Sequence, residues 1–171
     1  LGRLAGGTVT TGNDNIAIGN DAMHGGTTTG DSNIAIGVTT GDALTSGYQN
    51  ILIGKYAGQE MTTAYNNVAI GYNAMGDGAA DTNTNSNVAV GNSALEDVQS
   101  GYGNTALGPQ AHQGNSSGDL NVVLGYQAGR MVNTLSESII IGYRAMEISH
   151  NITQNTIAIG AMAAQYLNYD N

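Results

Sequence analysis

Short runs of aliphatic residues recur along the whole chain, and each run ends at a glycine. Asn15-Ile16-Ala17-Ile18-Gly19 is an example, and segments rich in Thr, Ser, Asn and Gly separate it from its neighbours. Successive glycines are 17 or 18 residues apart, with one interval of 20. The repeat glycines are Gly2, Gly19, Gly37, Gly54, Gly71, Gly91, Gly108, Gly125, Gly142 and Gly160. Self-similarity at a fixed short period is typical of a solenoid, in which each unit forms a rung stacked on the next.

Two further positions recur in almost every unit. An alanine stands three residues after the repeat glycine, with Thr40 as the exception, and an asparagine stands four residues before it. Ser138 and Thr156 replace the asparagine in the last two units. We expect the amides to stack and hydrogen-bond along a structural column. This Asn column comprises Asn15, Asn33, Asn50, Asn67, Asn87, Asn104 and Asn121.

The five residues that end at each repeat glycine predict a short β-strand, because Ile and Val fit a pleated surface. Gly12, Gly30, Gly47, Gly101 and Gly118 mark a turn into the strand, the repeat glycine marks the turn out, and a second strand should carry the alanine. A unit of 17 residues is too short for a strand and a useful crossover helix. We therefore predict an all-β fold, a parallel β-roll of about nine rungs, with residues 1–171 as a single repeat domain that starts and ends within a repeat.

Side chains alternate between the two faces of a strand, so each predicted strand has two different apolar faces. Ile16 and Ile18 share one face and Ala17 occupies the other, which suggests a thin interior lined by alanine. The large aliphatics would then point outward, where a continuous apolar stripe marks an interface between chains. The competing arrangement is a monomer with these residues inside. The predicted interface residues are Ile16, Ile18, Ile34, Ile36, Ile51, Ile53, Val68, Ile70, Val88, Val90, Leu107, Val122, Leu124, Ile139, Ile141, Ile157 and Ile159.

Composition limits the classes of partner. The formal net charge is −9, which disfavours nucleic acid because phosphates attract basic surfaces. No apolar run reaches 18 residues, so we expect no membrane insertion. The chain has 26 glycines and no cysteine, and the absence of cysteine fits an extracellular fibre that needs no disulfides.

Residues that could carry chemistry are dispersed. His24, His112 and His150 form no cluster with metal-ligand spacing, and we expect them in solvated or loop positions. Asp14, Asp31 and Asp119 fall near the turn before the strand, without a common register. We predict no enzymatic activity and no cofactor; a Ca²⁺ ion between Asp77 and Asp81 is a minor alternative.

Tyrosine and one long loop are the surface features with binding potential. Tyr48, Tyr65 and Tyr102 stand six residues before a repeat glycine, where exposed rings could stack on sugars or simply pack on each other. The longest unit places its extra residues in the segment 76–85, which should bulge outward as a loop. Asp77 and Asp81 lie in this loop and complete the predicted receptor contacts. Met23, Met75 and Met146 are expected to fill gaps in the core.

The repeated phrase Asn-x-Ala-Ile-Gly-x-x-Ala resembles the head repeat of YadA-like trimeric autotransporter adhesins. The segment Ser-Gly-Tyr-Gly-Asn-Thr-Ala-Leu-Gly-Pro-Gln-Ala (residues 100–111) looks like repeats in phage tail fibres. The resemblance covers essentially the whole chain. It implies a left-handed parallel β-roll, three chains about one axis, and a role in attachment.

Three functional hypotheses follow. The first is a non-enzymatic homotrimeric fibre segment on a virion or cell surface, either a spacer or an attachment head for a glycan or protein receptor, and part of a longer fibre. The second is a subunit of an extracellular filament that grows by end-to-end self-association. The third is a monomeric ice-binding or calcium-binding solenoid, which aligned columns of Thr or Asp would indicate.

Overall fold

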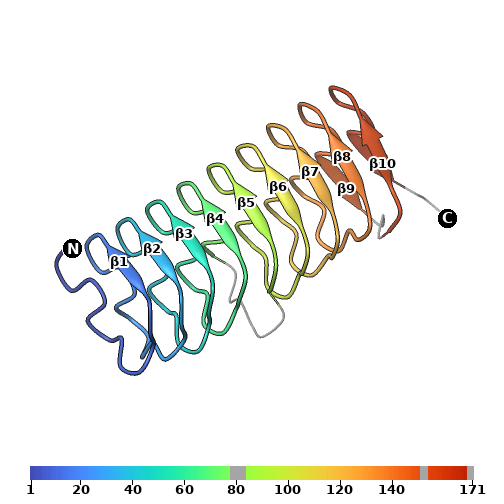
Figure 1. Ribbon diagram of the computed structural model, residues 1–171. Coiled ribbons are helices and arrows are strands. Elements are labelled where there is room, and N and C mark those ends of the chain that lie inside the picture. Colours follow the sequence, from blue (N-terminus) through green and yellow to red (C-terminus); the bar gives the residue numbers. More distant parts are fainter. Residues whose placement is uncertain (78–83, 151–153, 169–171) are drawn as a thin grey trace.

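The computed structural model describes residues 1–77, 84–150 and 154–168, and they form a β-solenoid with its two ends far apart (Figure 1). Nine three-residue strands make one parallel sheet, in the order β1-β2-β3-β4-β5-β6-β7-β8-β10. The all-β repeat architecture expected from the sequence is therefore confirmed. The strands are β1 (Ile16–Ile18), β2 (Ile34–Ile36), β3 (Ile51–Ile53), β4 (Val68–Ile70), β5 (Val88–Val90), β6 (Thr105–Leu107), β7 (Val122–Leu124), β8 (Ile139–Ile141) and β10 (Ile157–Ile159).

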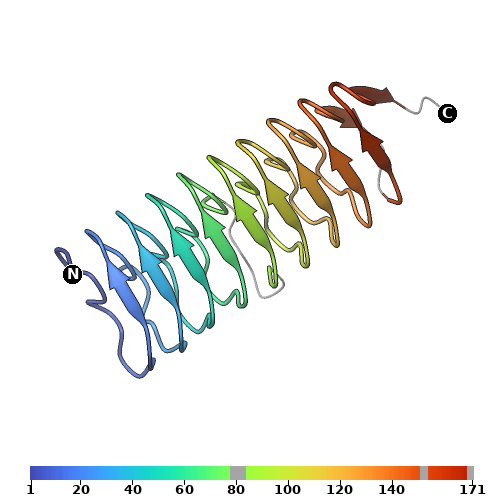
Figure 2. The same ribbon diagram turned by 45° about the horizontal axis from the view of Figure 1, so that its top comes forward.

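The strands lie in strict register along one face of the solenoid (Figure 2). Ile16 pairs with Ile34 and Ile34 with Ile51, so equivalent residues of successive units lie side by side. Backbone hydrogen bonds hold both ends of each strand. The amide of Val68 donates to the carbonyl of Asn87 in the next rung at 2.8 Å, and the amide of Gly71 donates to the carbonyl of Ile53 in the preceding rung at 2.8 Å.

Glycine is required at the repeat positions for two reasons: the positive φ of the backbone and the close approach of the next rung. Gly71 has a φ of +139°, and a Cβ added there would lie 2.4 Å from the carbonyl oxygen of Gly91 in the next rung. Gly54 and Gly91 show the same approach, at 2.3 Å and 2.5 Å. No side chain fits at such distances, so the glycine column lets one rung lie directly on the next.

The predicted second strand is not present. The segment after each repeat glycine adopts turn conformations, and residues two and four positions after the glycine have positive φ, as in Asn73 (+54°) and Met75 (+50°). These turns still bond from rung to rung: the amide of Asn73 donates to Lys55 at 3.0 Å and that of Met75 to Ala94 at 3.0 Å. A stacked turn gives the same closure as a strand in fewer residues, and the sequence pattern did not distinguish the two.

The core lies between the strands and these turns. The central strand residues, such as Ala69 and Leu52, and the alanines three positions after the repeat glycines are fully buried from Ala22 to Ala145. In several rungs a small core residue accompanies a large one. Met75 shares its rung with Ala69, whereas Gly58 shares its rung with Leu52, whose Cδ2 atom would lie 2.8 Å from a Cβ at Gly58. The gap-filling role predicted for Met23, Met75 and Met146 is confirmed, since all three are buried.

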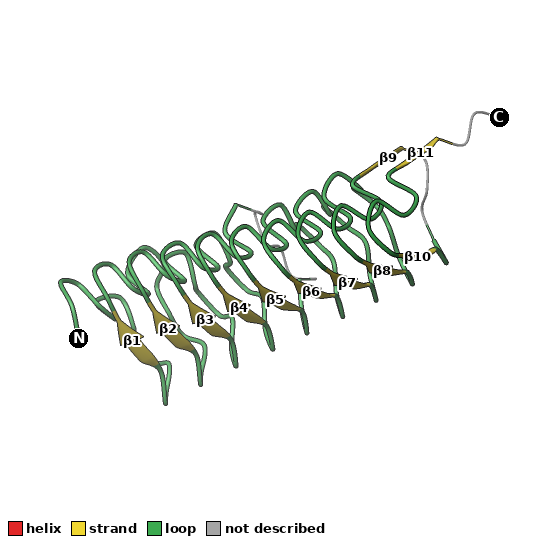
Figure 3. Cartoon of the chain, turned by 90° about the horizontal axis from the view of Figure 1, so that it is seen from above, coloured by secondary structure: helices red, strands yellow, loops and turns green. Residues whose placement is uncertain are grey.

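Two further strands pair away from the main sheet. β9 (Ile148–His150) and β11 (Tyr166–Asn168) form a parallel pair, on a different side of the rungs from β8 and β10 (Figure 3). Buried Glu147, directly before β9, accepts hydrogen bonds from Arg144 at 2.6 Å and Gln165 at 2.9 Å. The pKa of Glu147 is lowered, chiefly by the hydrogen bond from Arg144. These contacts tie the last described rungs together.

We predict that Gly71→Ala costs several kcal/mol of unfolding free energy, about 3 or more, because the substitution adds both backbone strain and a clash with Gly91. Gly160→Ala is the matched control. Gly160 has a φ of +124°, but an added Cβ would meet no heavy atom closer than 3.9 Å. Urea denaturation followed by circular dichroism measures both variants. Equal losses of stability in the two variants would show that backbone strain alone accounts for the need for glycine, and that the close contact between rungs adds nothing.

Candidate binding site

The Asn column forms the predicted ladder. The Oδ1 atom of Asn87 accepts bonds from the backbone amide of Asn104 at 2.9 Å and from its side-chain Nδ2 at 3.1 Å, while the Nδ2 of Asn87 donates to Gly101 at 2.8 Å. The same pattern joins the column from Asn15 to Asn121, and Ser138 continues it by accepting from the amide of Thr156 at 2.9 Å. Apart from Asn15, the asparagines are completely buried. They belong to the internal structure and present no surface to a ligand.

The large aliphatics at the first and third positions of the sheet strands point away from the core. Every predicted interface residue from Ile16 to Ile159 is exposed or half-buried, and the central residue of each strand of the nine-stranded sheet from β2 onward is buried. The competing arrangement, with the isoleucines inside and the alanines outside, is therefore wrong. The strand column shown in Figure 2 thus carries an apolar surface along nine rungs.

Tyrosine rings form short stacks on the surface. The rings of Tyr48 and Tyr65 lie parallel, with an interplanar angle of 1° and centroids 4.9 Å apart. Tyr126 and Tyr143 stack in the same manner at 5.8 Å. The prediction that neighbouring rings pack on each other is confirmed at these two pairs. Tyr102 stands in the same column as Tyr48 and Tyr65, and its side chain is 47% exposed.

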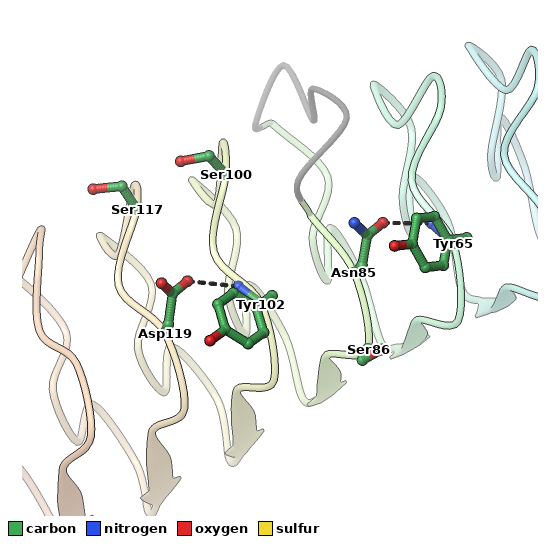
Figure 4. Close-up of a pocket in the computed structure, with 7 residues that line it drawn as sticks. All are labelled: Tyr65, Asn85, Ser86, Ser100, Tyr102, Ser117 and Asp119. Atoms are coloured by element: carbon green, nitrogen blue, oxygen red, sulfur yellow. Dashed lines mark hydrogen bonds between the residues drawn. The ribbon is translucent and has the colours of Figure 1, made fainter.

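An open cleft of about 480 Å³ extends from Tyr65 past Tyr102 to Asp119 (Figure 4). Asn85 occupies the equivalent position on the rung between the two rings, followed by Ser86. Ser100, Ser117 and Asp119 line the rest of the cleft. All seven lining residues come from the segments that lead into β5, β6 and β7 or, for Tyr65, β4. The cleft is therefore separate from the aliphatic columns of the strands.

Hydrogen bonds between rungs fix the cleft. The amide of Tyr65 donates to Oδ1 of Asn85 at 3.0 Å, and the amide of Tyr102 donates to Oδ1 of Asp119 at 2.9 Å. The amide of Asp119 in turn donates to Oγ of Ser136 at 3.0 Å. These residues all stand six positions before a repeat glycine. Side-chain oxygens in this column thus act as acceptors for the preceding rung, alternating with tyrosine rings.

Sequence reasoning identified Tyr65 and Tyr102 but missed the cleft. Asp14, Asp31 and Asp119 do not share one register, as expected, but Asp31 and Asp119 both stand six residues before a repeat glycine, in the same column as Tyr65 and Tyr102. The insertion between Gly71 and Gly91 also hid Asn85, which has the same offset from Gly91 that Tyr102 has from Gly108. Counting backwards from each repeat glycine, rather than comparing residue types, would have found the site.

The acidic residues of the long unit are only partly described. Asp81 lies outside the described residues, so the predicted pairing with Asp77 stays a prediction. Asp77 accepts a hydrogen bond from Asn73 at 3.1 Å, and Asn73 also bonds to Glu96. Burial raises the pKa of the Asp97 carboxyl, and the nearby charge of Asp77 raises it further. Within the described residues no cluster of three or more acidic, histidine or cysteine side chains could hold a metal ion.

His112 is not solvated, which corrects the sequence prediction. Its side chain is completely buried, four residues after Gly108, in the column that Met75 and Met146 occupy elsewhere. Neither ring nitrogen has a hydrogen-bond partner, and burial lowers the pKa of the imidazole to about 3. His24, five residues after its repeat glycine, is half-buried, while the side chain of His150 lies outside the described side chains.

No protein-family model matches this chain, and neither the curated proteins nor the solved structures contain a match to it. Within the described residues, no helix has the length and apolar character needed to cross a membrane. The fold and the surface geometry therefore carry the functional argument.

We predict that His112→Met stabilises the protein at neutral pH and makes its unfolding free energy fall less steeply as the pH is lowered. At neutral pH the change removes two unpaired buried nitrogens, which is worth about 1–3 kcal/mol. As the pH falls from 6.5 towards 3, the unfolded state binds a proton that the native imidazole does not. The wild type should therefore lose roughly 4 kcal/mol more than the variant over this range.

Urea titrations at a series of pH values would measure this difference. His24→Met is the matched control, because it removes a histidine that is only half-buried. Superimposable acid slopes for the wild type and His112→Met would contradict the assigned burial of a neutral imidazole.

Proposed function

We propose that this chain is a non-enzymatic segment of a homotrimeric surface fibre, serving as a spacer or attachment head on a virion or cell. The observation that carries the proposal is the outward orientation of the strand aliphatics. Ile16, Ile51 and Ile139 are each at least 37% exposed in the single chain, and their column is aliphatic along the whole sheet except at Thr105 in β6.

Such a surface favours association. Burial of an aliphatic side chain contributes about 1.5–3 kcal/mol, and two outward aliphatics recur in nearly every strand. Contiguous exposed apolar surface of this kind marks an interaction site in soluble proteins. Copies of this chain are suitable partners, because all of them repeat at the same spacing and can match aliphatics rung by rung. A closed threefold arrangement would cover the same face of every copy.

The rest of the surface supports a fibre role. The charge of −9 and the low content of charged residues give a polar, weakly acidic exterior. In-register strand pairing sets a regular rise along the axis, as a spacer requires. The resemblance of the repeated phrase to autotransporter heads and phage tail fibres agrees with this proposal.

We predict a solution mass of about three times 17.4 kDa for the 171-residue chain, measured by light scattering after size-exclusion chromatography. Ile70→Lys should dissociate the trimer by placing a charge at mid-length in the apolar columns, because an unpaired buried charge is costly. Met131→Lys is the matched control. Met131 is 45% exposed and lies outside the nine-stranded sheet, so this variant should keep the wild-type mass.

A stable wild-type monomer of 17.4 kDa would contradict the trimer. A heavier mass that increases with protein concentration would support the filament hypothesis instead. Equal dissociation by Ile70→Lys and Met131→Lys would show that the strand face is not the interface.

A further inference from the structure

We propose that the cleft between Tyr65 and Tyr102 binds one pyranose ring of an uncharged glycan. The cleft would give the proposed fibre a specific attachment site. The argument uses only residues of one chain and does not depend on trimerisation.

The spacing of the rings sets the size of the ligand. Tyr48 and Tyr65, on adjacent rungs, stack with their centroids 4.9 Å apart. Tyr65 and Tyr102 stand two rungs apart in the same column, so their rings are separated by about 10 Å, twice the strand spacing. Asn85 stands where the intervening ring would be, and its side chain is only 9% exposed. The column is therefore an aromatic ladder with one ring missing, and a single six-membered ring fills the space.

The polar groups indicate what kind of ring this is. The rings of Tyr65 and Tyr102 flank a slot that also contains Ser86, and the cleft continues past Tyr102 along the hydroxyls of Ser100 and Ser117 and the Asp119 carboxylate (Figure 4). A pyranose has the complementary arrangement, with apolar C–H faces and hydroxyls around its edge. Aromatic walls with a few placed polar groups are typical of small-ligand sites, and 480 Å³ lies within their usual volume range.

The charges of the residues that line the cleft limit the class of sugar that it can bind. Among the described residues that line the cleft, Asp119 is a carboxylate and none is lysine, arginine or histidine. Asp119 is held in place beside Tyr102 by the Tyr102 amide. An acidic sugar such as a sialic or uronic acid would therefore bind near a fixed negative charge, with no cation among these residues to pair with it, in a protein of net charge −9. Hexoses and N-acetylhexosamines carry hydroxyls and amides that can donate to it.

The cleft is also preorganised. The amide of Ser86 donates to the carbonyl of Tyr65 at 3.1 Å, and the amide of Gly103 donates to that of Asn85 at 3.1 Å. The rungs that carry the two rings are thus fixed relative to each other before a ligand arrives, which reduces the entropic cost of binding.

Saturation-transfer NMR on the full chain tests the proposal. The probes are cellobiose, lactose and diacetylchitobiose as uncharged glycans, and sialyllactose as an acidic glycan. We expect transfer to at least one uncharged probe, strongest at the C–H protons of a single ring, and weaker transfer to sialyllactose than to lactose. Tyr102→Ala should weaken binding about tenfold or more by removing one wall.

Asn85→Tyr is the decisive variant, because it inserts the missing ring and closes the slot. We expect it to fold and to lose binding, as Tyr48 and Tyr65 already show that rings on adjacent rungs stack in this column. Tyr126→Ala, in the stack of Tyr126 and Tyr143, is the matched control and should bind like the wild type. Thermal melts confirm that each variant is folded.

Absence of transfer to every uncharged probe, or binding that survives in folded Asn85→Tyr, would overturn the proposal. Preferential binding of sialyllactose would overturn it as well. Transfer to N-acetyltyrosinamide, with none to a sugar, would reassign the slot to an aromatic side chain of a protein partner. Because binding and solution mass are measured separately, a failure here leaves the trimer proposal intact, and the reverse also holds.

Discussion

The whole structure depends on each rung lying on the next at hydrogen-bonding distance, in register, around its full circumference. The column of repeat glycines shows how strict this constraint is, since a Cβ at Gly19 would lie 2.1 Å from the carbonyl oxygen of Gly37. The Asn ladder satisfies the backbone groups that the strands and turns leave unpaired. For example, Asn104 binds the amide of Asn121 at 3.0 Å and the carbonyl of Gly118 at 2.7 Å. Sequence repetition follows, because only identical backbone shapes can stack in this manner.

The same constraint limits the core. The rung closes through tight turns with positive φ, so its interior holds only a few side chains, such as Leu52, Ala57 and Met61 in one rung. A large residue at one position therefore requires a small one nearby, as Leu52 does with Gly41 and Gly58. His112 fits this size rule, but it places two unpaired nitrogens in a column where Met75 and Met146 are apolar. The core therefore restricts side-chain volume more strictly than side-chain polarity. It can hold a buried neutral imidazole, but this lowers the stability of the protein.

The period and the alternation in the sequence were sufficient to predict the parallel sheet, its register and the outward isoleucines, because these follow from side-chain geometry within a strand. The turn that carries Ala74 was predicted as a strand, since alanine is compatible with both and the left-handed conformation of Asn73 leaves no pattern of its own. The orientation of His112 was missed because polarity was given more weight than its position relative to Gly108. The cleft at Asn85 was hidden by the insertion in its unit, which displaces the residue from its expected place.

A regular solenoid offers identical surroundings on every rung, so a specific site requires a break in a column. In the tyrosine column that break is Asn85, where an acceptor replaces a ring and leaves two aromatic faces unpaired with each other. The exchange does not disturb stacking, because the Oδ1 atom of Asn85 satisfies the amide of Tyr65 in the preceding rung. Outward columns can therefore vary without loss of the fold, whereas the glycine column cannot, and the Asn column changes only to Ser138 and Thr156 in the last two units. This division explains how one chain can combine a largely apolar sheet face with a differentiated cleft.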